Sequence, residues 1–179
     1  MKRRATLIII FSLAFASSVG LSTANPTVVP QDPLLLPSTE QSLNLSITPH
    51  ELSCNASIRP GTYQADEPLK LQVTAHYPAW YIQLHSSSLK GPDEEIGPED
   101  IYAVITQGAV ALDQPQLVIQ DGELGETTVE VLIEVRTTKR YKTGTYSGQL
   151  YVISGYPQAP APQVITVPFE VEVSCSVSG

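Results

Sequence analysis

From Leu43 onward, apolar and polar residues alternate with a period of two along most of the chain. Successive side chains of a β-strand point to opposite faces, so this period predicts strands that are buried on one side only. In the clearest run, the inward side chains are Val129, Val131, Ile133 and Val135. The outward side chains of the same run are Glu130, Glu134 and Arg136. The whole pattern predicts nine strands: Leu43–Ile47, Leu52–Ile58, Leu69–Ala75, Trp80–His85, Ile101–Thr106, Gln116–Gln120, Thr128–Thr137, Gln149–Ser154 and Val164–Val177.

Turn signals rich in Pro and Gly separate these runs, for example at Arg59-Pro60-Gly61, Lys90-Gly91-Pro92, Asp121-Gly122 and Lys142-Thr143-Gly144. Residues 121–126 lie between two strands, and we interpret them as a hairpin turn in which glycines supply positive φ. No stretch has the period of an amphipathic helix, although residues 98–101 are compatible with a single turn. Many short strands with frequent turns predict an all-β fold, a β-sandwich of about seven to nine antiparallel strands.

Three segments differ in character along the chain. Residues 1–24 combine a cationic start, an apolar run over 7–16 and small residues at Ser22 and Ala24, which is the layout of a secretory signal peptide. The alternative is a membrane anchor, but the run is shorter than the roughly 20 residues that a spanning helix needs. Residues 25–42 are rich in proline and predict an extended arm, either a leader or a segment that docks on another subunit. Residues 43–179 are expected to form the β-sandwich domain.

Two short motifs stand out. The first is Pro60-Gly61-Thr62-Tyr63, followed by the runs 69–75 and 79–81. The second is the run 143–152, in which a Gly-x-Tyr turn leads into an alternating strand. Together they resemble bacterial exported immunoglobulin-like surface modules, including pilin-like subunits. The chain departs from antibody-type domains because its cysteines lie near the two ends of the domain and do not bracket Trp80. The resemblance implies an immunoglobulin-like β-sandwich and transfers no functional residue.

Charge restricts the partners. The chain has 10 Lys and Arg against 18 Asp and Glu, a formal net charge of −8. Removing residues 1–24 would leave 7 against 18, a net charge of about −11. Because phosphate binding needs clustered cations, we expect no nucleic-acid partner, and we expect no membrane insertion of the mature chain.

The two cysteines, Cys54 and Cys175, are expected to form one disulfide, because an exported protein meets an oxidising compartment. By strand alternation both thiols would face the core, and the bridge would close a loop of about 120 residues, worth roughly 2–4 kcal/mol. Two free thiols are the alternative. We predict no metal site from these cysteines, because His50, His76 and His85 show no ligand spacing.

We expect no catalytic, cofactor-binding or metal-binding residues and therefore no enzyme. The serines lie in runs such as 86–88, outside any Gly-x-Ser-x-Gly context. The acidic stretch from Asp93 to Asp100 is the best candidate for a cation site, but it lacks EF-hand spacing and is interpreted as solvated loop charge. His76 and His85 flank Trp80 and Tyr81, where they could line a pocket.

Aromatic residues gather around Trp80 and at the strand near Tyr151. Alternation predicts that Trp80 is buried and that Tyr81 and Tyr151 are exposed, where they could stack against sugar rings. The sequence therefore predicts a non-enzymatic structural or interaction component of the bacterial cell envelope or surface. It would be exported to the periplasm, the cell surface or the medium, with a protein partner or self-assembly as in a pilin-like subunit. The alternative is a carbohydrate-binding or adhesive module with a glycan partner.

Overall fold

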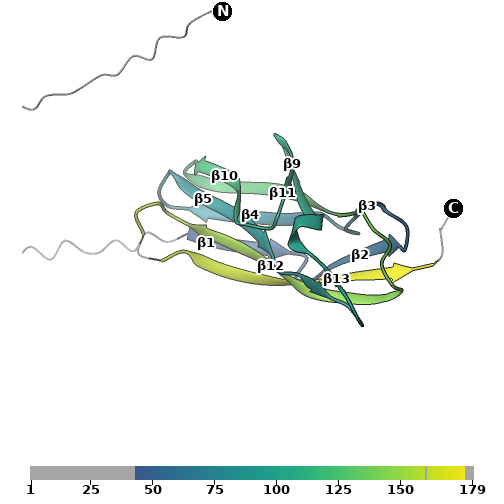
Figure 1. Ribbon diagram of the computed structural model, residues 1–179. Helices are drawn as coiled ribbons and strands as arrows, with labels where there is room; N and C mark the ends of the chain where they lie inside the picture. The colour runs from purple at the N-terminus through teal and green to yellow at the C-terminus, as the bar shows by residue number, and fades with distance from the viewer. Residues whose placement is uncertain (1–42, 160, 176–179) are drawn as a thin grey trace, which may run out of the picture. The chain divides into compact units, whose positions relative to one another are not determined.

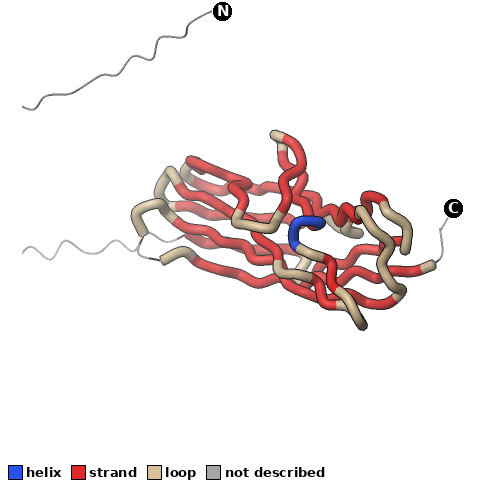
Figure 2. Tube along the Cα trace, in the orientation of Figure 1, coloured by secondary structure: helices blue, strands red, loops and turns tan. Residues whose placement is uncertain are grey.

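The computed structural model describes residues 43–159 and 161–175, and this region is a β-sandwich of two packed sheets (Figure 1). Strands make up almost all of the regular structure, and the 3₁₀ helix η1 (Pro98–Asp100) is the short helical turn in Figure 2. The all-β sandwich expected from the sequence is therefore confirmed, as is the single helical turn after Gly97. The signal peptide and the arm predicted for residues 1–42 lie outside the described residues.

The first sheet has six strands in the order β1-β4-β11-β8-β9, with β3 also paired to β11. Their bounds are β1 Leu43–Thr48, β3 Gly61–Gln64, β4 Leu69–Ala75, β8 Ile101–Ile105, β9 Gly108–Ala111 and β11 Gly125–Thr137. All pairings in this sheet are antiparallel.

The second sheet has seven strands in the order β10-β5-β12-β13-β2, with β6 paired to β12 and β7 paired to β6. Their bounds are β2 Leu52–Ser57, β5 Trp80–Ser86, β6 Leu89–Lys90, β7 Glu95–Ile96, β10 Gln116–Gly122, β12 Gly144–Gly155 and β13 Gln163–Ser174. One pair departs from the expected antiparallel arrangement, because β13 runs parallel to β2. The chain reaches this position by leaving the first sheet after β1 and entering the second sheet at β2, through Pro49.

The alternating runs bury the faces that the sequence predicts. Val131, Ile133 and Val135 of β11 are fully buried, and they meet Phe169 and Val171 of β13 in one hydrophobic core. Trp80 is also fully buried, as expected, and its Nε1–H donates a hydrogen bond of 2.7 Å to the carbonyl oxygen of Glu123. The core therefore fixes the backbone of the strands whose other faces are exposed to solvent.

Two backbone contacts join the sheets at their sides. At one side, Ala65 donates its N–H to Ile133 of the first sheet and also forms a bridge with Cys54 of the second sheet. At the other side, Leu112 donates its N–H to Ile101, while its carbonyl oxygen accepts the N–H of Ser86 in β5. The sandwich is thus closed by its own chain at both places.

The predicted disulfide between Cys54 and Cys175 is wrong in this structure, where both thiols are free, Cys54 buried and Cys175 exposed. In the parallel pair of β2 and β13, Cys54 lies opposite Val171, which is four residues before Cys175. Four residues of strand span roughly 13 Å, whereas the Cα atoms of a disulfide lie within about 7 Å. Burial, followed by the charge of Asp66, raises the pKa of the Cys54 thiol to about 12.

The connection between β10 and β11 also differs from the expectation. The two strands belong to different sheets, so residues 122–125 form a crossing between the layers and not a hairpin turn. Positive φ is found at Gly125, as predicted, and additionally at Asp121, which has a φ of 54°. The sequence pattern also did not reveal the short strands β3, β6, β7 and β9.

Candidate functional site

The outer face of the second sheet carries a row of side chains that crosses four strands. The registers place Leu117 of β10 beside Gln83 of β5, Gln83 beside Ile153 of β12, and Ile153 beside Val164 of β13. Leu117 is 44% exposed and Val164 is 54% exposed, which is unusual for large apolar side chains. This row is the centre of what we call the apolar half-face: Tyr81, Gln83, His85, Leu117, Tyr151, Ile153 and Val164.

A stacked aromatic pair lies in the next row. Tyr151 pairs with His85 across β12 and β5, and their rings stack with centroids 5.8 Å apart and an interplanar angle of 19°. Their polar atoms are engaged within the fold, because His85 Nδ1 lies 3.0 Å from the carbonyl oxygen of Leu112 and the Tyr151 hydroxyl donates to Gln149 Oε1. Two flat side chains are thereby held against the sheet.

Tyr81 lies at the other end of this half-face, opposite Gly155 of β12. The tip of the Tyr81 ring lies over Gly155, since a Cβ atom built on that glycine would be 3.4 Å from the Tyr81 hydroxyl oxygen. Tyr81 and Tyr151 are both half-buried on the outer face, which confirms the outward direction predicted for them. Cross-strand contact with a glycine lets an aromatic ring lie across the sheet instead of standing away from it.

A pocket of about 200 Å³ opens beside Tyr81. Its lining comes from β5, β10 and the loop after β12, and includes Gln83, Leu117, Gln120, Asp121 and Pro157. Neither His76 nor His85 lines this pocket. Sequence reasoning missed the pocket because its walls meet only when β10 pairs with β5 and the loop after β12 returns beside them.

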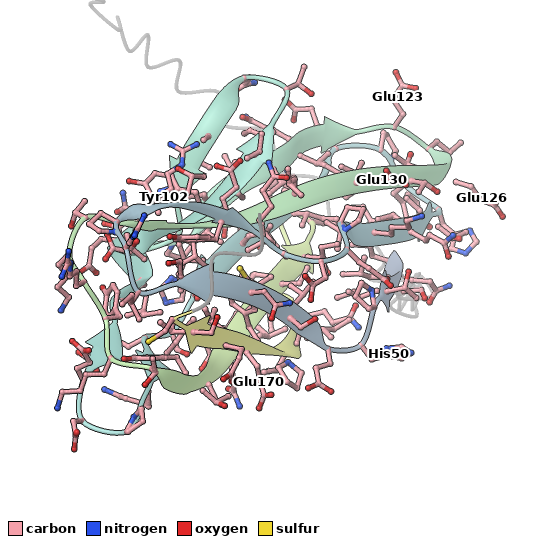
Figure 3. All side chains as sticks on the ribbon, turned by 90° about the vertical axis from the view of Figure 1, so that its right-hand side faces the viewer. His50, Tyr102, Glu123, Glu126, Glu130 and Glu170 are labelled. Carbon is pink, nitrogen blue, oxygen red and sulfur yellow. The ribbon has the colours of Figure 1, made fainter. Side chains whose placement is uncertain are left out.

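Charge is segregated on this sheet. The apolar half-face contains no Asp, Glu, Lys or Arg, in a chain whose net charge is −8. The other half of the same outer face carries Glu170 and Glu172, which accept hydrogen bonds from Ser147 and Thr145. Figure 3 shows Glu130 and Glu170 on opposite sides of the sandwich, while Glu123 and Glu126 extend from one end of it. Glu170 and Glu172 therefore lie outside the apolar half-face, and Asp121 borders it at the pocket beside Tyr81.

The acidic stretch considered for a cation is held by lysines instead. Asp93 Oδ2 accepts from Lys142 Nζ at 2.8 Å, and Glu95 pairs with Lys90. Glu94 accepts the Lys142 N–H at 2.7 Å and the Tyr146 hydroxyl at 3.1 Å. Within residues 43–159 and 161–175, no group of three or more His, Cys, Asp or Glu side chains is arranged to hold a metal ion.

These contacts shift the pKa values of side chains in and beside the 91–95 loop. The hydrogen bond from Lys142 is the largest cause that lowers the pKa of Asp93, and the backbone N–H of Lys142 is the largest cause that lowers the pKa of Glu94. Burial, followed by the hydrogen bond with Glu94, raises the pKa of Tyr146 to about 12. The Tyr141 hydroxyl donates to Asp100 at 2.9 Å, and its pKa is raised for the same kinds of reason. This cluster fastens the 91–95 loop to the 139–144 loop.

The serine run is part of the backbone network. The Ser86 hydroxyl donates to the carbonyl oxygen of Ser87, and the Ser87 hydroxyl donates to that of Ser88. The Ser87 hydroxyl oxygen also accepts the N–H of Gln149.

In the described part of the chain, no helix is long and apolar enough to cross a membrane.

No protein-family model matches the chain, and no curated protein matches it. The solved structures with a similar backbone include the following three. The CooA pilin subunit of enterotoxigenic Escherichia coli is 11% identical, with a TM-score of 0.48 over 75% of this chain and 99% of that one. The adhesin CfaE of enterotoxigenic E. coli is 10% identical, with a TM-score of 0.46 over 75% and 49%. A family 123 glycoside hydrolase from Clostridium perfringens is 14% identical, with a TM-score of 0.45 over 77% of this chain and 28% of that one. These similarities concern the β fold alone.

Proposed function

We propose that the protein is a non-enzymatic structural or interaction component of a bacterial cell envelope or surface, which assembles with further copies of itself through the apolar half-face. The observation that carries the proposal is the row in which the exposed side chains of Leu117 and Val164 flank the half-buried Ile153 on the outer face of the second sheet. The signal-peptide layout of residues 1–24 supports an exported location.

Electrostatics supports this choice of surface. Two copies with a net charge of −8 each repel one another wherever acidic side chains would face each other. The apolar half-face reduces this cost, because its seven residues hold no carboxylate, with Asp121 at its border, and present apolar and aromatic groups that gain free energy when they leave water. A two-fold contact uses the same patch on both subunits, so one face of this kind is sufficient for a dimer.

Size-exclusion chromatography with light scattering and electron microscopy of residues 25–179 test the proposal. We expect dimers or larger assemblies for the wild type. The double variant Ile153→Lys and Val164→Lys should be monomeric and folded. The matched control is Thr145→Lys and Ser147→Lys, which adds the same charge to the other half of the same face and should still assemble. A wild type that stays monomeric at high concentration would contradict self-assembly.

A deletion of residues 25–42 separates this surface from the arm that the sequence suggests as a docking segment. If the arm made the contact, the deletion would abolish assembly and the lysine variant would not. We expect the opposite result, because the apolar half-face belongs to the folded domain and does not depend on those residues.

A second candidate function, carbohydrate binding, is favoured by one observation. Tyr81 lies across Gly155 with a small polar-lined pocket beside it, which is an arrangement suited to a sugar ring.

A further inference from the structure

We propose that the pocket beside Tyr81 binds one neutral pyranose ring of a glycan. The inference deepens the second candidate function, carbohydrate binding, and rests on it. Tyr81, Gln83 and Leu117 belong both to this pocket and to the apolar half-face, so a copy assembled through that face would compete with the glycan. The pocket is about 200 Å³, below the roughly 300–1,000 Å³ typical of sites that enclose a drug-sized ligand. It therefore suits a single ring of a longer molecule whose remainder stays outside.

Tyr81 supplies the platform. Its neighbours in β5, Trp80 and Ile82, are fully buried, so the backbone that carries the ring is fixed by the core. The ring tip lies over Gly155, where no side chain lifts it from the sheet. An aromatic ring held flat and half-exposed offers its face to the C–H groups on one side of a sugar ring.

The polar groups around the platform match hydroxyl groups. Gln83 and Gln120 carry amides that both donate and accept hydrogen bonds, and Asp121 carries a carboxylate that accepts them. The backbone beside Asp121 is anchored, because the carbonyl oxygen of the next residue, Gly122, accepts the N–H of Ala79 at 2.8 Å. A sugar hydroxyl can act as donor to one of these groups and acceptor from another.

The same lining disfavours other ligand classes. It contains no Lys or Arg, so a phosphate, a sulfate or an acidic sugar would meet only the negative charge of Asp121. Leu117 and Pro157 add apolar wall to the pocket, but the three polar side chains would be left without partners by a purely apolar ligand. A neutral ring with one C–H face and several hydroxyls satisfies both parts of the wall.

The rest of the apolar half-face extends the site. The stacked pair of Tyr151 and His85 lies on the same face, and His85 is four residues from Tyr81 along β5, a distance of roughly 13 Å. A glycan of several residues that starts in the Tyr81 pocket can reach this second aromatic pair. We therefore expect an oligosaccharide to bind more tightly than its single ring.

The experiment is a nuclear magnetic resonance titration of ¹⁵N-labelled residues 25–179, both as wild type and as the monomeric variant Ile153→Lys and Val164→Lys, with the methyl glycosides of glucose, galactose, mannose and N-acetylglucosamine. We expect at least one of them to give saturable shifts centred on the amides of residues 81–83 and 120–122. Saturation transfer from the protein to the sugar should be strongest at the C–H face that lies on Tyr81.

Two variants and one control decide the role of the pocket. Tyr81→Leu keeps an apolar side chain but removes the flat ring, and should weaken binding about three- to tenfold. Gln120→Ala, at an exposed edge position, should weaken binding without disturbing the fold. The control Tyr102→Leu removes a half-buried tyrosine from the outer face of the other sheet and should bind like the wild type.

The inference is overturned if none of the four glycosides gives saturable shifts with the monomeric variant, or if both Tyr81→Leu and Gln120→Ala bind like the wild type. The assembly variant Ile153→Lys and Val164→Lys distinguishes this failure from failure of the proposed function. It should lose assembly while the pocket amides still respond to the methyl glycoside, because neither residue lines the pocket.

Discussion

Replacing Gly122 by alanine tests how tightly the core closes around Trp80. Gly122 ends β10 opposite Trp80, and a Cβ atom built on it would lie 2.1 Å from Trp80 Cε2. Trp80 is fully buried and its indole N–H is bonded to the carbonyl oxygen of Glu123, so the ring cannot yield without losing packing or that hydrogen bond. Gly122 does not have positive φ, so backbone strain does not contribute to the expected effect.

The magnitude follows from three contributions. Overpacking a core costs about 1–3 kcal/mol, and weakening one buried hydrogen bond costs about 1 kcal/mol. Alanine restricts the unfolded chain more than glycine does, which raises the free energy of unfolding by about 0.4–1 kcal/mol and offsets part of this loss. We therefore expect Gly122→Ala to lower the free energy of unfolding by about 1–3 kcal/mol.

Urea unfolding followed by fluorescence is the direct assay, because Trp80 is the single tryptophan of the chain. With a slope of about 2 kcal/mol per molar urea, the unfolding midpoint should fall by roughly 0.5–1.5 M. The matched control is Gly155→Ala, where the nearest atoms to an added Cβ lie at 3.4 Å, an ordinary contact distance. This control should change the free energy of unfolding by less than about 0.5 kcal/mol. Equal midpoints for the two variants would refute the packing argument.

Further predictions concern the cysteines and the 91–95 loop. Cys175→Ser should leave the free energy of unfolding unchanged, whereas Cys54→Ser should lower it by about 1–3 kcal/mol, because the variant buries a hydroxyl group. Equal losses for the two variants in urea unfolding would indicate that the two cysteines are bonded to each other. Tyr146→Phe should lower the free energy of unfolding by about 1 kcal/mol through the lost hydrogen bonds to Glu94 and Lys142, and an unchanged midpoint would contradict that role. The pKa of Glu94 is lowered from 4.5 on folding, so the stability that this carboxylate contributes is present above pH 4.5 and is lost as the pH falls through the lower folded value. The difference in urea midpoint between the wild type and Glu94→Gln should therefore shrink as the pH falls through that range. A constant difference would contradict a stabilising role for the Glu94 carboxylate. The pKa of Tyr146 is raised from 10.0 to about 12, so stability should fall as the pH rises from 10 to 12, and Tyr146→Phe should fall less in the same titration.

The sequence was sufficient to predict the fold class, because a strand that is buried on one side has alternating apolar and polar residues, and this pattern can be read from neighbouring residues alone. The period of two in β11 and β13 identified which of their side chains enter the core, and the structure buries Val131, Ile133 and Val135 as predicted. The same local rule placed Trp80 inward and Tyr81 and Tyr151 outward. These predictions needed no knowledge of which strand lies beside which.

The cysteines show where local reasoning fails. Alternation correctly gave Cys54 an inward direction, but it could not give the register between β2 and β13. Register depends on two segments separated by more than a hundred residues, and a shift of a few residues decides whether two thiols meet. The short strands β3 and β9 were missed for a related reason, since their pairing with β11 and β8 is set by those partners rather than by a pattern of their own.

By itself, the sequence determined the alternation, the turns and the balance of charge, because each is a property of neighbouring residues. The tertiary structure decided that Leu117, Gln83, Ile153 and Val164 form one row, and that the polar wall of the pocket faces Tyr81. Those residues come from four strands and a loop, and hydrogen bonding between strands is what brings them together. The apolar half-face and its pocket are therefore products of strand pairing, which the alternation within a single strand does not encode.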